Sequence, residues 1–119
     1  MPDQTVYLLG PMTGYPDDNR PAFRAATKLL RSRGYRVTSP DELDQRDPAA
    51  SREWAAMLRR DLPWLAAATM GVALPGWRAS KGATLEATNL HALGAPIFEL
   101  IEGELFPVPE SRLPRPTHP

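Results

Sequence analysis

Residues 4–14 read Gln-Thr-Val-Tyr-Leu-Leu-Gly-Pro-Met-Thr-Gly. The first six form a short apolar run, and Gly10-Pro11 ends it. A run this short, with β-branched and aromatic members, is typical of a buried central strand of a parallel sheet. The segment that follows, 10–20, is rich in Gly, Pro, Asp and Asn. It therefore predicts a loop at the carboxyl end of the strand.

The same succession of strand, loop and helix continues along the chain. We expect further strands at 35–39, 69–75 and 95–100, and helices at 21–34, 49–68 and 83–93. Asn19 is expected to cap the first helix and Gly34 to end it. Pro63 predicts a kink or a restart of the second helix, with Asp61 as the cap of the second piece. Residues 41–50 are acidic and polar and predict a loop or an irregular turn.

This order of elements predicts an α/β fold, a three-layer sandwich with a four- to five-stranded parallel, Rossmann- or flavodoxin-like sheet. We expect one domain over 1–104. Five of the 14 prolines fall in the last 13 residues. The remainder, 105–119, is therefore expected to be a proline-rich tail: a surface arm, a contact to a partner subunit, or disordered.

Composition excludes several classes of protein. The chain has 14 basic and 14 acidic side chains, which argues against a nucleic acid polymer as partner. It has no cysteine, so it carries no disulfide and no thiolate metal site. No apolar run approaches membrane-spanning length, and we expect a cytoplasmic protein. His91 has no second ligand at metal spacing, so no metal is expected.

Ligands of such sheets bind beyond the carboxyl ends of the strands, which selects the loops 10–20, 40–48 and 76–82. Residues 10–14, Gly-Pro-Met-Thr-Gly, match neither a dinucleotide nor an ATP fingerprint. Their backbone N–H groups and the Thr13 hydroxyl could hold a small anion or a sugar hydroxyl. The alternative is a tight structural turn.

Loop 76–82 leads directly into a helix. The Ser80 hydroxyl and free N–H groups at the helix start could bind phosphate, with Glu86 two or three residues inside the helix leaning toward the cleft. The alternative is a capping box, in which Ser80 or Gly82 caps the helix and the acid favours its dipole. Trp77 could stack on a base or act as a packing lid.

Asp61 follows Arg59 and Arg60. This context is typical of a helix cap or of a solvated ion pair. If Asp61 and Glu86 converge, however, the two carboxylates suit displacement at a sugar carbon. Trp54 and Trp64 are expected to be core or interface anchors.

Three segments together resemble the nucleoside 2-deoxyribosyltransferase superfamily. They are Val6-Tyr-Leu-Leu-Gly-Pro-Met-Thr-Gly14, Arg60-Asp-Leu-Pro-Trp-Leu65, and Ser80-x-Gly-x-x-x-Glu86. The resemblance covers roughly residues 5–98. Within the superfamily, the chain is similar above all to 2'-deoxynucleoside 5'-phosphate N-hydrolases and to short bacterial and phage relatives that begin with the same Gly-Pro-Met-Thr-Gly element.

The resemblance implies a role for each motif residue. Glu86 would attack the anomeric carbon and form a glycosyl ester, Asp61 would move protons on the base or the water, and Tyr7 would position Glu86 and the sugar. Ser80 and Gly82 would hold the 5'-phosphate or 5'-hydroxyl with help from N–H groups of the 10–14 loop. The substrate-binding set is then Gly10, Pro11, Met12, Thr13, Gly14, Trp77, Ser80 and Gly82.

The chain also departs from the family pattern. The phosphate hydrolases carry Ser and Arg where this chain has Pro11 and Thr13. Asp17 and Asp18 would repel a phosphate unless they face away, although Arg20 and Arg78 could compensate. Thr69 stands where the family usually has Asp.

The expected reaction is cleavage of the N-glycosidic bond of a (deoxy)ribonucleoside 5'-monophosphate by water, without metal or organic cofactor. Base exchange and non-catalytic nucleotide binding are the alternatives. Because sites of this superfamily are commonly completed by a neighbouring subunit, the resemblance also implies a homodimer or a higher homo-oligomer.

Overall fold

The computed structural model describes residues 4–48 and 53–113. Its centre is a five-stranded sheet of β1 (Thr5–Leu9), β2 (Arg36–Thr38), β3 (Met70–Ala73), β4 (Ile97–Ile101) and β5 (Glu104–Pro107). The strand order is β2-β1-β3-β4-β5. The first four strands are parallel, and β5 pairs antiparallel with β4. The predicted α/β sandwich with a four- to five-stranded sheet is thus confirmed, with an antiparallel fifth strand.

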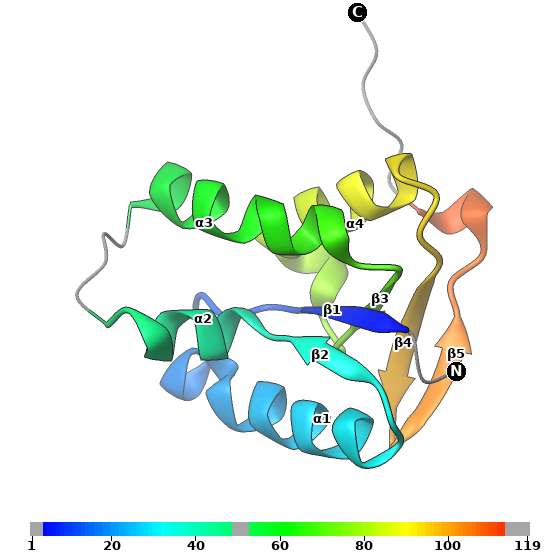
Figure 1. Ribbon diagram of the computed structural model, residues 1–119, viewed down its shortest axis with the longest axis horizontal. Coiled ribbons are helices and arrows are strands. Elements are labelled where there is room, and N and C mark those ends of the chain that lie inside the picture. The colour runs from blue at the N-terminus through cyan, green and yellow to red at the C-terminus, as the bar shows by residue number, and fades with distance from the viewer. Residues whose placement is uncertain (1–3, 49–52, 114–119) are drawn as a thin grey trace, which may run out of the picture.

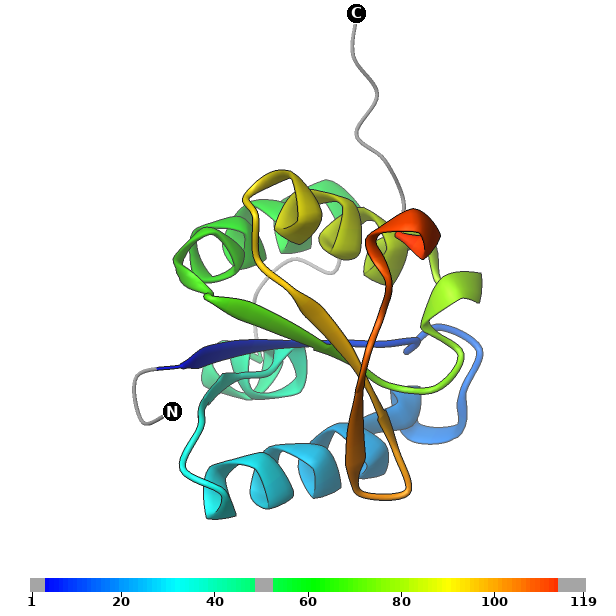
Figure 2. The ribbon, with the colours of Figure 1, turned by 90° about the vertical axis from the view of Figure 1, so that its right-hand side faces the viewer.

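Helices cover both faces of the sheet (Figure 1). On one face lies α1 (Arg20–Ser32), and on the other lie α3 (Trp54–Ala67) and α4 (Lys81–Ala92). Figure 2 shows the same three layers from the side, with the sheet between the helices. Short 3-10 turns at Pro16–Asn19, Trp77–Ala79 and Glu110–Arg112 complete the fold.

The alternation of β1 decides which side chains face which layer. Val6 and Leu8 join the buried cluster that contains the α1 residues Phe23 and Leu30. Tyr7 and Leu9 point to the opposite face, into the cluster formed with α3 and α4. The strand therefore delivers the Tyr7 phenol to the layer that carries Asp61 and Glu86.

Two helical segments differ from the predictions. Residues 40–46 form a helix, α2 (Pro40–Arg46), where a loop or an irregular turn was expected. Its signals were present: Pro40 in the first turn followed by two acids, and Arg46 in the last turn. The second long helix runs unbroken from Trp54 to Ala67 with Pro63 inside it, so Asp61 is an interior residue and not a cap. Residues 49–52 of the predicted helix lie outside the described part.

Pro63 lies on the exposed side of α3. There, the carbonyl that loses its helical partner can be hydrated, which explains why no restart is needed. The other two helix starts lie slightly earlier than predicted. Helix α1 begins at Arg20, and its flanking Asn19 makes no side-chain cap but donates its amide to the Pro11 carbonyl at 2.9 Å. Helix α4 begins at Lys81, with Ser80 as its cap.

The segment from Glu104 to Leu113 packs onto the fold, where a tail beginning at 105 was expected. Strand β5 lies at the sheet edge, where proline is tolerated because half of the backbone groups face outward. Val108 and Leu113 are buried in the cluster beneath α4. Residues 114–119 lie outside the described part. None of the described helices is long and apolar enough to cross a membrane.

Candidate active site

A pocket opens at the carboxyl edge of the sheet, where the strand order reverses between β1 and β3. All three loops selected from the sequence border it, and α3 forms its fourth side. The cavity measures about 520 Å³, a size suited to one small organic ligand. Its lining comprises Gly10, Pro11, Met12, Thr13, Tyr15, Pro40, Trp54, Met57, Leu58, Asp61, Ala79, Ser80, Lys81, Gly82, Ala83 and Glu86.

The loop after β1 enters the pocket because Gly10 lets two segments approach closely. A Cβ at Gly10 would lie 2.9 Å from the Leu74 Cβ, a contact that backbone atoms would have to relieve. The loop then turns, with the Tyr15 N–H donating to the Met12 carbonyl at 3.1 Å. The loop is a structural turn and a pocket wall at the same time, so the two interpretations of the sequence do not exclude each other.

The start of α4 places Ser80 and Glu86 on the same side of the helix. The Ser80 hydroxyl accepts the Ala83 N–H at 3.2 Å and so caps the helix. The first-turn N–H groups of Lys81 and Gly82 have no acceptor within the helix, and both residues line the pocket. Glu86 lies in the second turn, later than predicted, and therefore is not the acid of a capping box.

Glu86 meets the Tyr7 phenol beneath the pocket. The Tyr7 hydroxyl donates to Glu86 Oε2 at 2.5 Å, joining β1 to α4 across 79 residues. Burial raises the pKa of Glu86 to about 8, with the charge of Asp61 adding to the rise, while the hydrogen bond from Tyr7 and the charge of Arg60 oppose it. Burial and the two nearby acids hold the pKa of Tyr7 well above its ordinary value. Glu86 is thus a carboxyl that gains and loses a proton near neutral pH.

Asp61, on α3, lies near the Tyr7–Glu86 pair. It is buried, lines the pocket, and its Oδ1 accepts Arg60 Nε at 2.7 Å. Burial raises the pKa of Asp61, although the hydrogen bond and charge of Arg60 pull it down. The charge of Asp61 contributes to the raised pKa of Glu86, and both side chains line the pocket, so the convergence that the sequence left open is observed. Asp61 does form an ion pair, but a partly buried one rather than a solvated one.

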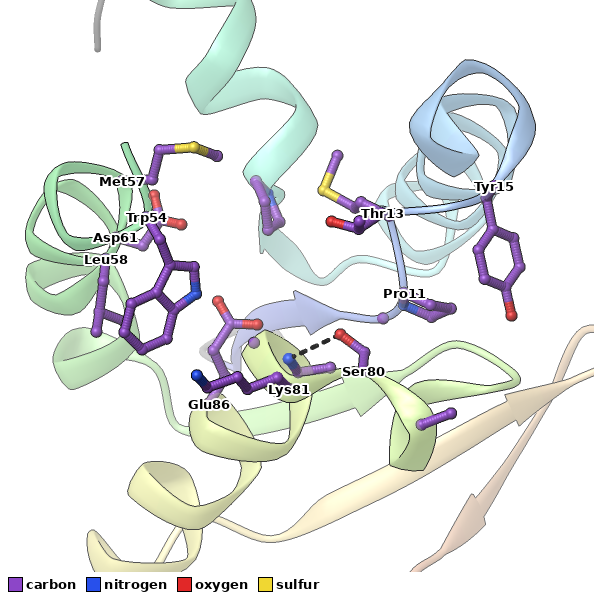
Figure 3. A pocket seen from close by; sticks show the side chains of 16 residues that line it. Pro11, Thr13, Tyr15, Trp54, Met57, Leu58, Asp61, Ser80, Lys81 and Glu86 are labelled. Atoms are coloured by element: carbon purple, nitrogen blue, oxygen red, sulfur yellow. Dashed lines mark hydrogen bonds between the residues drawn. The ribbon is translucent and has the colours of Figure 1, made fainter. Parts of the chain in front are cut away.

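Apolar side chains of α3 form the wall beside the two acids (Figure 3). Trp54, Met57 and Leu58 lie on one side of the cavity, and Pro11 and Thr13 lie opposite. Trp54 and Trp64 are about half exposed and belong to neither core cluster, so of the two expected roles, core or interface anchor, the core role is wrong. The Lys81 ammonium lies 5.0 Å from the centre of its ring, so a cation–π contact joins α3 and α4.

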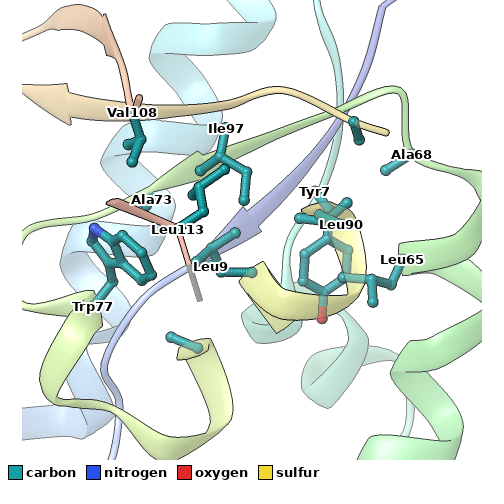
Figure 4. Packing of buried hydrophobic residues seen from close by; sticks show 13 residues of the cluster. Tyr7, Leu9, Leu65, Ala68, Ala73, Trp77, Leu90, Ile97, Val108 and Leu113 are labelled. Carbon is teal, nitrogen blue, oxygen red and sulfur yellow. The ribbon is translucent and has the colours of Figure 1, made fainter. Parts of the chain in front are cut away.

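Trp77 and Gly14 lie away from the pocket that the sequence assigned to them. Trp77 is 1% exposed and packs in the core cluster, where a base cannot reach it. Figure 4 shows it at the opposite end of that cluster from Tyr7. The packing alternative is therefore correct for Trp77, because its loop folds back onto β4 and its indole N–H points to Glu99 at 3.4 Å. Gly14 supplies a left-handed turn residue, with φ +86°.

The two arginines expected to balance a phosphate are engaged elsewhere. Arg20 donates to Asp41 at 2.8 Å and reaches Asp44 at 3.4 Å. Arg78 stacks on Trp77 and lies 3.5 Å from Glu99. The cation that borders the pocket is Lys81.

Sequence reasoning missed Trp54, Met57, Leu58, Tyr15 and Lys81 as pocket residues. Trp54, Met57, Leu58 and Asp61 share the 3–4–7 spacing of one helix face. The presence of Asp61 on that face was the signal that it borders a cavity. Among residues 4–48 and 53–113, no group of three His, Asp or Glu side chains is placed to hold a metal ion.

The fold and the pocket define the class: a doubly covered α/β sheet with paired carboxylates at its topological switch point. The chain belongs to the family described as "Domain of unknown function (DUF4406)", whose model matches residues 4–99. No curated protein matches the chain.

Two solved structures share the fold. The 2-deoxyribosyltransferase of the psychrotolerant bacterium Bacillus psychrosaccharolyticus superimposes with a TM-score of 0.64 at 22% identity, covering 80% of this chain and 70% of the other. A conserved protein from Enterococcus faecalis V583 gives a TM-score of 0.60 at 19% identity, covering 81% and 62%. At such identities the similarity shows the fold, and it confirms the resemblance indicated by the three motifs at that level.

Proposed function

We propose that the protein hydrolyses the N-glycosidic bond of a (deoxy)ribonucleoside 5'-monophosphate, releasing the base and a sugar phosphate. The observation that supports this most is the placement of Glu86, Asp61 and Tyr7. Two carboxyls from different helices meet a phenol at one side of a pocket large enough for a nucleotide. Paired carboxyls of unequal environment are the groups that displacement at a sugar carbon requires.

In the first step the Glu86 carboxylate attacks the anomeric carbon and forms an ester bond to the sugar. The C–N bond breaks, its electron pair goes to the base nitrogen, and that nitrogen takes a proton from Asp61. The reacting form therefore holds one proton on the carboxyl pair, located on Asp61. Tyr7 hydrogen-bonds to Glu86 and fixes the oxygen of the nucleophile that stays outside the new bond.

In the second step water replaces the base. Asp61, now ionised, takes a proton from the water, whose oxygen attacks the anomeric carbon. The ester bond breaks, and its electron pair returns to Glu86. Because the cycle needs one proton on the pair, the rate is expected to fall above about pH 8, where Glu86 loses its proton.

The remainder of the pocket suits the other parts of the substrate. The apolar wall of Trp54, Met57 and Leu58 can pack against a base. The unpaired N–H groups of Lys81 and Gly82, with the Lys81 ammonium beside them, can receive the 5'-phosphate or 5'-hydroxyl. A Cβ at Gly82 would meet nothing within 4 Å, so this part of the pocket has space for such a group.

The test is chromatography of a panel of nucleosides and 5'-monophosphates after incubation with the protein, with Glu86→Gln as the blank. We expect release of base from at least one monophosphate by the wild type and none by the variant. Adding a second base distinguishes hydrolysis from exchange, since more exchange product than free sugar phosphate would identify a transferase. Binding without turnover, unaffected by Glu86→Ala, would identify a non-catalytic nucleotide-binding module.

The expected homo-oligomer is a proposal as well. Sedimentation of the protein during turnover tests it, and a fully active monomer would contradict it.

A further inference from the structure

Arg60 connects the pocket to a helix that lies outside it. Its Nε donates to Asp61 Oδ1 at 2.7 Å, and its Nη1 donates to Asp44 Oδ1, also at 2.7 Å. Asp44 belongs to α2 and is in turn within 3.4 Å of Arg20 from α1. The side chain next to the candidate acid is therefore held at both ends, and three helices fix its position.

The third nitrogen of this guanidinium shows how Asp61 is held. Nη2 is buried and has no hydrogen-bond partner within residues 4–48 and 53–113. Nε and Nη2 lie on the same edge of a guanidinium, and a two-bond pair with a carboxylate uses both. Arg60 instead holds Asp61 through one oxygen. A two-bond pair would favour the ionised carboxylate strongly, whereas a single bond leaves the other oxygen able to carry a proton.

We propose that Arg60 is a positioning residue of the reaction: it holds Asp61 by Oδ1, is anchored on α2 by Asp44, and leaves the second oxygen of Asp61 outside the ion pair and available for proton transfer. The Tyr7 phenol is a second hydrogen-bonding neighbour of Asp61. This inference rests on the proposed function. When the C–N bond breaks, the proton leaves that second oxygen for the base nitrogen, and Asp61 becomes a carboxylate still bonded to Nε. In the second step the same oxygen takes the proton of the attacking water.

The charge of Arg60 also acts on the neighbouring groups. The titratable groups facing it are Tyr7 from β1, Asp44 from α2, Asp61 from α3 and Glu86 from α4. Burial raises the pKa of Asp61 and Glu86, and the positive charge of Arg60 opposes the rise in both. Removing the charge should therefore move both titrations to higher pH.

The experiment compares Arg60→Gln and Arg60→Lys with Arg59→Gln, a matched control that removes the same charge from the exposed neighbouring position. Carbon-13 NMR follows the carboxyl titrations of Glu86 and Asp61 without any substrate, and base release gives kcat and KM. We expect Arg60→Gln to raise both titration midpoints and to lower kcat about 10²-fold, with little change in KM. The ratio of wild-type kcat to the kcat of Arg60→Gln should decrease between pH 6 and pH 9, because the pH profile of the variant is shifted to higher pH.

Arg60→Lys keeps the charge but cannot bridge Asp44 and Asp61 with two separate nitrogens. It should leave the titrations near the wild-type values yet still lower kcat, and Arg59→Gln should match the wild type in both measurements. Unchanged titrations in Arg60→Gln, or wild-type kcat in Arg60→Lys, would overturn the inference. If Arg60→Gln does not fold, the kcat of Arg60→Lys alone tests whether Arg60 positions Asp61. A wild-type protein that releases no base refutes the proposed function, while the substrate-free titrations still test the hold on Asp61.

Discussion

Two buried carboxyls of this protein sit in opposite surroundings. Asp41, on α2, is 1% exposed and accepts from Arg20 at 2.8 Å and from Arg24 at 3.1 Å. Burial alone would raise the pKa of Asp41, but the hydrogen bonds and charges of the two arginines outweigh burial and lower it. Within the described residues, Glu86 receives one side-chain hydrogen bond, from a phenol, and burial raises its pKa to about 8.

The contrast separates a structural acid from a reactive one. The arginines near Asp41 stabilise its ionised form. The paired carboxylate therefore stabilises the junction of α1 and α2 and is unreactive. Among the described residues, Glu86 has no arginine hydrogen-bonded to it, so its ionised form is higher in free energy. When Glu86 does ionise, the carboxylate is therefore a stronger nucleophile. Asp61 lies between the two extremes, since it has one arginine and a pKa that burial still raises.

The largest expected effect is on turnover. Glu86→Gln should lower the rate of base release about 10³-fold or more, since the nucleophile is lost. Asp41→Asn should change it less than about threefold at a temperature where the variant is folded. Chromatographic base release measures both. Equal losses in the two variants would remove the distinction between the two acids.

The second prediction concerns the phenol that replaces a cation beside Glu86. Tyr7→Phe should lower kcat about 10²-fold by removing the donor at 2.5 Å, and it should raise the pKa of Glu86 further. Tyr35→Phe, a change of the same kind on a tyrosine next to α1, is the control. A full rate in Tyr7→Phe would show that the hydrogen bond has no part in the reaction.

The third prediction concerns folding stability. Asp41→Asn should lower the free energy of unfolding by about 2 kcal/mol at pH 7, because it leaves Arg20 partly buried and without its shortest ion pair. Arg24 is mostly exposed, so its share of the loss is small. Urea denaturation measures the difference. No loss of stability would mean that the ion pairs of Asp41 are replaced by water without cost.

The fourth prediction uses the pH dependence of stability. Glu86 has a raised pKa in the folded state, so the folded protein binds the extra proton between about pH 4.5 and pH 8. Stability should therefore fall as pH rises through this range, by at most about 1.4 kcal/mol per pH unit. The contribution of Asp41 has the opposite sign, being present above its ordinary pKa and lost as pH falls through the lowered one.

Denaturation of Glu86→Gln at several pH values tests this fourth prediction. The variant should lose the decline and become more stable than the wild type above pH 8. The exposed Glu104→Gln is the matched control. A decline that persists in Glu86→Gln would assign it to another group.

Some features of the fold and of the two acids' surroundings could be predicted from the sequence, and others could not. Short apolar runs placed all four parallel strands, and their carboxyl ends located Glu86, Ser80 and the 10–14 loop at one edge. What depends on contacts between distant segments was not predictable from local patterns: the Arg20–Asp41 pair was missed, the packing of Trp77 was one of two open alternatives, and the Tyr7–Glu86 contact across 79 residues was implied only by the family resemblance. Helix α2 was missed although its signals were local, because a run of acidic residues is also typical of a polar loop.

The most direct measurement of the central claim is a carbon-13 NMR titration of the Glu86 and Asp41 carboxyls in the wild-type protein, assigned with Glu86→Gln and Asp41→Asn. We expect a midpoint near 8 for Glu86 and one below its ordinary value for Asp41. Titration of Glu86 near its ordinary value of 4.5 would contradict this claim, because the two acids would then not differ in the way that makes one reactive.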